Sequence, residues 1–110
     1  MIKLAILRVK PDEENHLRDW MAELNHRTAE VRETFANEGM RHEQAHLLQT
    51  SDGPILIYAM EAADHDRVAS AFQHSTLPID HEHVRIMKQV LAGPAKVELL
   101  YECKAEDHDC

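Results

Sequence analysis

Two stretches of this chain, residues 2–9 and 55–60, have the length and composition of strands and carry apolar side chains on both faces. Side chains alternate between the two faces of a strand, so a strand with one wet face alternates apolar and polar residues. The first stretch instead places Leu4 and Ile6 on one face and Leu7 on the other. The second places Ile55, Ile57 and Ala59 opposite Leu56, Tyr58 and Met60. Both strands therefore need cover on both sides.

A long apolar stripe with helical spacing follows the first strand. It predicts one continuous helix that begins within Pro11 to Glu14 and ends at Gly39. Acidic residues in the first turn suit the positive end of the helix dipole. The stripe consists of Leu17, Trp20, Met21, Leu24, Thr28, Val31 and Phe35.

A turn signal, Ser-Asp-Gly-Pro over 51–54, separates residues 40–50 from the strand at 55–60 and predicts a hairpin. Asp64 is placed to cap a short helix that runs to about Gln73. The hairpin and this helix occupy the middle of the chain.

A second helical piece is expected near 81–91, and alternating side chains predict a last strand over 95–103. The order is then β-α-β-β-α-β, which predicts an α+β fold. We expect a ferredoxin-like sandwich with a four-stranded antiparallel sheet and its helices on one face. Residues 1–103 form the single domain, and residues 104–110 form a polar C-terminal tail.

One helical layer covers only one face of such a sheet. Leaving the other face in water would forfeit roughly 1.5–3 kcal/mol for each large apolar side chain. A second sheet is the simplest cover, so we predict a homodimer packed sheet against sheet, a dimeric α+β barrel. The alternative is a monomer whose tail or loops cover this face.

Composition excludes several partners. The formal net charge of the 110 residues is −8, which argues against a nucleic acid. No apolar stretch is long enough to cross a membrane, and the start lacks the order of a signal peptide. Cys103 and Cys110 are expected to be free thiols of a cytoplasmic protein. Three isolated glycines form no phosphate loop, which argues against nucleotide cofactors. The sequence leaves the presence of haem, flavin or metal open.

The string at 42–46 reads His-Glu-x-x-His, the pattern of zinc proteases when it lies on a helix. Here it follows a helix-stopping glycine and precedes a hairpin turn. On a strand, His42 and His46 lie about 13 Å apart and do not share one ion. We therefore expect a strand and no metal site at this string.

Asp80 and His83 are three residues apart at a helix start, so their side chains can meet. A carboxylate that orients an imidazole is typical of an acid, a base or a metal ligand. The alternative is a helix cap with a histidine in the first turn. A metal-binding hypothesis would add Glu43 or His42 to this pair.

Arg8, Glu43 and Tyr58 form a third group, because the predicted topology brings their strands together. Such a cluster binds a polar ligand or forms a satisfied structural network, and the residues alone leave both open. Trp20 is expected in the core. Core positions also suit Met21, Met60 and Met87.

Residues 2 to 101 resemble a small bacterial family of unknown function in the dimeric α+β barrel superfamily. Its most specific blocks are Glu-Gly-x3-Glu, from Glu38 to Glu43, and Ser-x4-Asp-x-x-His, from Ser75 to His83. Asp12 departs from the expected glycine and affects only the helix start. Further matching residues are Arg8-Val9-Lys10-Pro11, Trp20, Leu24, Arg27, Thr34, Leu47, Tyr58-Ala59-Met60-Glu61-Ala62, Asp64 and Ile79.

The resemblance implies a site between sheet and helices in each subunit. The superfamily includes cofactor-free monooxygenases, haem-degrading enzymes, lactone isomerases and plain ligand-binding domains, so the fold does not choose an activity. We expect a small polar or aromatic ligand, with acid–base chemistry at His83 and Asp80. The rival hypothesis is a structural or regulatory dimer without catalysis. The residues expected to place the ligand are Glu43, Tyr58 and Ser75, with Arg8 or Arg27 offsetting an anionic group.

Overall fold

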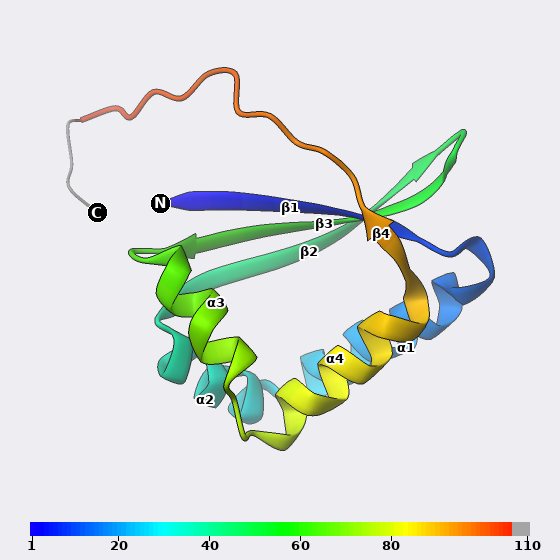
Figure 1. The fold of residues 1–110 in the computed structure, drawn as a ribbon, viewed down its shortest axis with the longest axis horizontal. Coiled ribbons are helices and arrows are strands. Elements are labelled where there is room, and N and C mark those ends of the chain that lie inside the picture. The colour runs from blue at the N-terminus through cyan, green and yellow to red at the C-terminus, as the bar shows by residue number, and fades with distance from the viewer. Residues whose placement is uncertain (107–110) are drawn as a thin grey trace.

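The computed structural model describes residues 1–106 and shows a four-stranded antiparallel sheet with all its helices on one side (Figure 1). The order along the chain is β-α-α-β-β-α-α-β, which confirms the predicted α+β fold. Its elements are β1 (Ile2–Val9), the 3-10 turn η1 (Pro11–Glu13), α1 (Glu14–His26), α2 (Thr28–Glu38), β2 (Met40–Thr50), β3 (Gly53–Ala62), α3 (His65–Gln73), α4 (Pro78–Val90) and β4 (Leu91–Pro94).

The strand order is β2-β3-β1-β4, so the two strands with apolar faces lie in the centre of the sheet. Ala5 lies opposite Tyr58 in the β1–β3 pair, and Ala45 lies opposite Tyr58 in the β2–β3 pair. This register decides which side chains share a face. The odd-numbered residues of β1 and the even-numbered residues of β3 face the helices, together with Glu43 on β2.

Local chemistry explains where the predicted elements end. The Asp64 side chain accepts hydrogen bonds from the backbone N–H groups of Asp66 and Arg67, each at 3.1 Å, which confirms the predicted N-cap of α3. Gly39 has φ +83° and ends α2 in the left-handed conformation that glycine adopts without steric cost. The β2–β3 hairpin also forms as predicted.

The prediction of one continuous helix up to Gly39 is wrong, because the helix breaks at Arg27. Arg27 has φ −116° and ψ 41°, and α2 starts again at Thr28. The apolar stripe continues through a break of one residue, so periodicity alone does not reveal it. The break lets α1 pack against α4 while α2 turns to pack against α3.

The prediction of a last strand over 95–103 is also wrong. β4 covers only Leu91–Pro94, and its pairing with β1 ends with a hydrogen bond from Ala95 N–H to the Ile6 carbonyl, at 2.8 Å. The chain then leaves the sheet on the side away from the helices (Figure 1). Alternating side chains form a strand only where a neighbouring strand supplies hydrogen bonds. The exposed apolar residues of this segment are Val97, Leu99, Leu100 and Tyr101.

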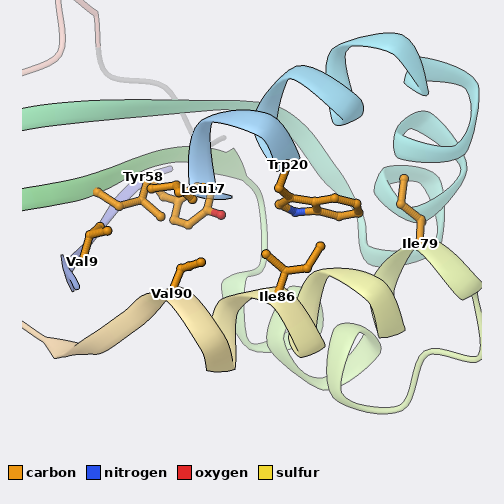
Figure 2. Packing of buried hydrophobic residues seen from close by; sticks show 8 residues of the cluster. Val9, Leu17, Trp20, Tyr58, Ile79, Ile86 and Val90 are labelled. Carbon is orange, nitrogen blue, oxygen red and sulfur yellow. The ribbon is translucent and has the colours of Figure 1, made fainter. Parts of the chain in front are cut away.

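The main core lies between the helices and the covered face of the sheet (Figure 2). Trp20 is only 5% exposed, which confirms its predicted place in the core. The predicted core methionines, Met21, Met60 and Met87, pack against this cluster. The buried members are Val9, Leu17, Trp20, Leu56, Tyr58, Ile79, Ile86 and Val90.

The opposite face of the sheet carries apolar side chains that no element covers. Leu4 on β1 is 44% exposed and Leu48 on β2 is 48% exposed, and Ile57 lies between their strands. The helical layer thus covers one of the two apolar faces. None of the helices described is long and apolar enough to span a membrane. Cys103 is a free thiol, whereas Cys110 lies outside the described residues.

The Asp64 cap gives a direct test of how α3 begins. Asp64→Ala removes both capping hydrogen bonds and should lower the free energy of unfolding by about 1 kcal/mol. Asp64→Asn keeps an accepting oxygen and should stay close to the parent chain. Urea denaturation measures both variants, and equal losses would contradict a capping role.

Candidate functional site

A cavity of about 710 Å³ lies between the covered face of the sheet and the helices α2, α3 and α4. Its size suits a small organic molecule. Most of its wall is apolar, including Ala5, Leu7, Val31, Phe35, Met60, Val68, Phe72 and Met87. Its polar groups are therefore few, and they stand out against an apolar wall.

Four of the residues predicted from the sequence line this one cavity: Glu43, Tyr58, Asp80 and His83. Ser75 does not line it but donates a hydrogen bond to Asp80 at 2.5 Å. The structure thus brings five predicted residues into one region. They come from β2, β3, α4 and the loop before α4, and are far apart in the sequence.

His83 lies in an aromatic box. Trp20 Nε1 donates a hydrogen bond to His83 Nδ1 at 2.8 Å, and His83 Nε2 lies 3.2 Å from Tyr58 Oη. Phe72 meets the imidazole edge-on, with ring centroids 6.1 Å apart. Because an indole nitrogen only donates, Nδ1 must be the acceptor, and the neutral ring carries its proton on Nε2. This proton points at Tyr58.

The same surroundings keep His83 neutral. Burial lowers the pKa of His83 below its ordinary value, and the negative charge of Asp80 opposes this shift. A proton on Nδ1 would also face the indole N–H and break that hydrogen bond. Burial, followed by the charge of Glu43, raises the pKa of Tyr58 well above its usual range, so Tyr58 keeps its hydroxyl proton.

Asp80 does not orient His83 as the sequence suggested. Its Oδ2 accepts from Thr34 Oγ1 at 2.7 Å and from Ser75 Oγ at 2.5 Å. Within residues 1–106, no hydrogen bond joins Asp80 to His83, because Trp20 and Tyr58 occupy both imidazole nitrogens. Asp80 acts on His83 only through its charge, and it ties α4 to α2.

Two glutamates add acidity to the cavity. Glu38, at the end of α2, is 4% exposed, and Glu43 projects from β2 toward the helices. Burial raises the pKa of each carboxyl to about 7, and the charges of Asp80 and Glu43 add to the shift at Glu38. Both groups therefore exchange protons near neutral pH.

Glu38 was missed as a site residue from the sequence. The Glu-Gly pair was noted only as part of a family block, and a glutamate at a helix end is commonly exposed. Its position one turn after Thr34 on the buried side of α2 was the available signal. Among the described residues, Glu38 has no hydrogen-bond or ion-pair partner.

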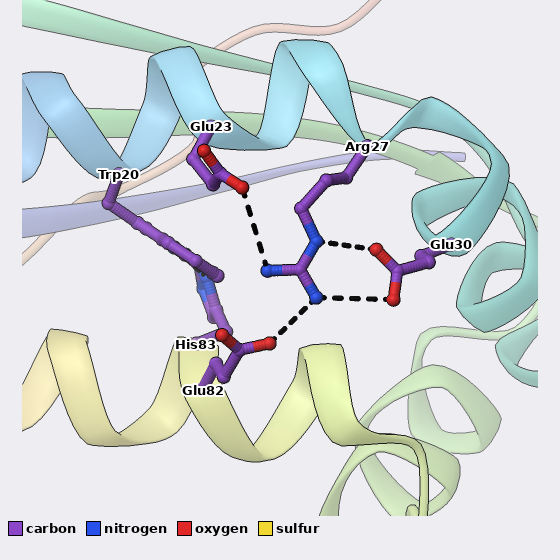
Figure 3. A network of polar contacts seen from close by, with 6 residues as sticks. All are labelled: Trp20, Glu23, Arg27, Glu30, Glu82 and His83. Atoms are coloured by element: carbon purple, nitrogen blue, oxygen red, sulfur yellow. Dashed lines mark hydrogen bonds and ion pairs between the residues drawn. The ribbon is translucent and has the colours of Figure 1, made fainter.

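The two arginines proposed to offset an anionic group do not line the cavity. Arg8 is exposed and lies opposite Ile55, on the face of the sheet away from the helices. Arg27 binds three carboxylates at the α1–α2 break: Glu23, Glu30 and Glu82 (Figure 3). Hydrogen bonds to Glu30 and Glu82 raise the pKa of Arg27, and its guanidinium joins the α1–α2 break to α4 through Glu82.

The His-Glu-x-x-His string lies on β2, as predicted. His42 and His46 are exposed on the uncovered face, whereas Glu43 points to the cavity. Within the part of the chain that the structure describes, no group of three histidine, cysteine or acidic residues is arranged to hold a metal. His42 and His46 therefore lie on a strand and not on one face of a helix, which is the arrangement that the zinc-protease pattern requires.

Residues 1–107 match the model of a family of unknown function, DUF6176. The chain belongs to this family. The match covers nearly the whole sequence and confirms the predicted resemblance to a family of unknown function. No curated protein matches the chain.

Solved structures show the same fold. Tetracenomycin F2 cyclase from Streptomyces glaucescens, a type-II polyketide cyclase, has a TM-score of 0.60 and 23% identity over 96% of this chain and 99% of that chain. Rv0793 from Mycobacterium tuberculosis gives 0.53 and 19%, over 96% of each chain. A Nitrosomonas europaea protein of unknown function, NE2512, gives 0.50 and 22%, over 97% and 98%. The DUF6176 chain thus has the dimeric α+β barrel fold.

The raised pKa of Glu38 predicts how stability depends on pH. Between pH 4.5 and about 7 the folded state binds more protons than the unfolded state, so the free energy of unfolding falls as pH rises. Glu38→Gln removes the part of this dependence that Glu38 contributes, while Glu43 keeps its own. The variant should be more stable than the parent by about 1–3 kcal/mol at pH 8, with a smaller difference at pH 5.

Urea denaturation across this pH range measures the effect. Glu33→Gln, an exposed change on the same helix, is the matched control and should leave the pH dependence unaltered. Parallel pH profiles for Glu38→Gln and the parent would contradict the assignment.

Proposed function

We propose that this DUF6176 protein binds a small, largely apolar ligand in the cavity between sheet and helices. The observation that carries the proposal is a 710 Å³ space with an apolar wall and a few convergent polar groups: Glu38, Glu43, Tyr58 and His83. A domain of this size gains stability from close packing, and an unfilled space gives up those contacts. A ligand would restore them.

Where the bound ligand reacts, we assign acid–base chemistry to His83 acting with Tyr58, and place Asp80 in a positioning role. The Nε2 proton of His83 points at the Tyr58 oxygen, so the Tyr58 hydroxyl accepts there and turns its own proton to Met87 Sδ at 3.9 Å. A thioether sulfur is a weak acceptor, so a polar ligand atom in the cavity could take its place. Tyr58 and Glu43 both line the cavity, and the charge of Glu43 contributes to the raised pKa of Tyr58. In such a step the Tyr58 O–H bond would break as the proton passes to the ligand, and His83 Nε2–H would donate a hydrogen bond to the phenolate oxygen that remains.

The second candidate function is a structural or regulatory dimer without catalysis. Its support is that both nitrogens of His83 already have partners inside the protein, as in a satisfied structural network. Under this hypothesis the cavity holds no specific ligand. A binding measurement decides between the two.

Nile red, a neutral apolar dye, tests the cavity. We expect saturable binding of one dye per chain, seen as enhanced dye fluorescence. Ala5→Phe places a ring beside Tyr58 in the cavity and should weaken binding by at least about tenfold, or about 1.4 kcal/mol. Ala63→Phe, at an exposed position outside the cavity, is the control. Equal binding by both variants would reject the cavity as the binding site.

We also propose a homodimer through the uncovered face of the sheet. The exposed apolar residues of β1 and β2 support it, as does the segment after β4, which leaves on that side with its apolar side chains exposed. Burying this face recovers roughly 1.5–3 kcal/mol for each large apolar side chain.

Ile57→Glu tests the homodimer, because it places a charge in the middle of the uncovered face. Light scattering should give the parent chain twice the mass of one 12.6 kDa protomer, and the variant the mass of one. Arg32→Glu, on the exposed side of α2, should remain dimeric. A parent chain that is already monomeric would overturn the proposal.

A further inference from the structure

The cavity is acidic on its polar side, and the carboxyls there have no ion-pair partner within residues 1–106. Glu38, Glu43 and Asp80 all line it, and the charges of Glu43 and Asp80 reach the Glu38 carboxyl. Asp80 is satisfied by two hydroxyl donors. The two glutamates have no such donors in the described part of the chain.

Glu38 is the strongest evidence for a missing ligand group. The residue is only 4% exposed, and its side chain has no hydrogen-bond or ion-pair partner among the described residues. No fully inaccessible side-chain nitrogen or oxygen among residues 1–106 lacks a hydrogen bond. The Glu38 oxygens therefore keep access to the cavity. A carboxyl group held in an apolar site without a donor is costly, and a ligand that supplies the donor removes that cost.

The basic residues that line the cavity do not supply this missing donor to Glu38 or Glu43. Lys3 and Lys88 also line the cavity, but both residues are exposed, and neither makes an ion pair with Glu38 or Glu43 in the described part of the chain. His83 is engaged with Trp20 and Tyr58, and His65 Nε2 donates a hydrogen bond to the Met1 carbonyl oxygen at 2.8 Å. The interior thus attracts a positive charge and offers nothing to an anion.

We propose that the ligand of this cavity is a protonated amine on an apolar or aromatic body, with its ammonium group between Glu38 and Glu43. This inference rests on the proposed ligand-binding function and narrows it to one class of ligand. The apolar body would contact the ring of Phe35 or Phe72 and the side chain of Met60. An ammonium group supplies three donors, which suits two carboxylates.

The proposal implies a dependence on pH. An ammonium ion binds the ionised carboxylates, whereas both carboxyls take up protons near neutral pH. The charged and titratable neighbours are Asp80 and His83 from α4, Tyr58 from β3, His65 and Arg67 from α3, and the exposed Lys3 and Lys88. The pKa of His83 is lowered and that of Tyr58 is raised, so both shifts favour the neutral forms, whereas the two glutamates titrate near neutral pH.

Three probes of similar shape test the ligand class by calorimetry: 2-phenylethylamine, 2-phenylethanol and 3-phenylpropionate. At pH 8 we expect the amine to bind at least about tenfold more tightly than the alcohol, and the carboxylate to bind most weakly. Lowering the pH to 6 should weaken the amine about tenfold and leave the alcohol unchanged, since only the amine needs ionised glutamates.

Variants locate the effect. Glu38→Gln should weaken the amine about tenfold at pH 8 and flatten its pH dependence, with the alcohol unaffected. Glu33→Gln, exposed on the same helix, should change neither. Equal affinities of amine and alcohol, or tighter binding of the carboxylate, would overturn the amine inference.

The outcomes also separate this inference from the proposed function. If Nile red binds and Ala5→Phe blocks it, but the amine has no advantage over the alcohol, the cavity binds ligands of another class and the amine inference fails. If neither the dye nor any probe binds, the ligand-binding function itself fails.

Discussion

A sheet with two apolar faces and a single layer of helices is the constraint on which the rest of this structure depends. β1 and β3 lie in the centre and present large apolar side chains to both sides. Helices cover one side, where the core and the cavity form. The other side leaves apolar side chains exposed, which is the physical basis for the proposed second copy of the chain. The fold, the cavity and the proposed homodimer thus follow from one pattern.

The cavity contains glutamates that destabilise the fold, and contacts between the surrounding helices offset that cost. Unpartnered glutamates in an apolar space lower the free energy of unfolding once they ionise. Around them, Asp80 joins α4 to α2 through Thr34, and Arg27 joins the break between α1 and α2 to α4 through Glu82. These contacts anchor the helices that form the wall. A site whose polar groups lack partners in the protein is typical of one built to receive them from a ligand.

Sequence patterns located most elements, because hydrophobic period and capping chemistry are local. The Asp64 cap and the β2–β3 hairpin are examples. These patterns did not predict the helix break at Arg27. The apolar stripe runs through the break, and Glu82, which binds Arg27, is remote in sequence. The prediction of a last strand failed for a different reason. Residues 95–103 alternate as a strand does, but they pair with no neighbouring strand within the described residues.

The sequence by itself determined the two-faced central strands, the α+β order and the family, and it named Glu43, Tyr58, Asp80 and His83 as site candidates. Tertiary structure decided their partners. Asp80 accepts hydrogen bonds from Thr34 and Ser75, and the two imidazole nitrogens of His83 contact Trp20 and Tyr58. Only the packed fold revealed Glu38 as a buried, unpartnered carboxyl. The physical reason is that residue type and period are properties of a segment, whereas a hydrogen-bond partner and a shifted pKa depend on which remote segments pack around it.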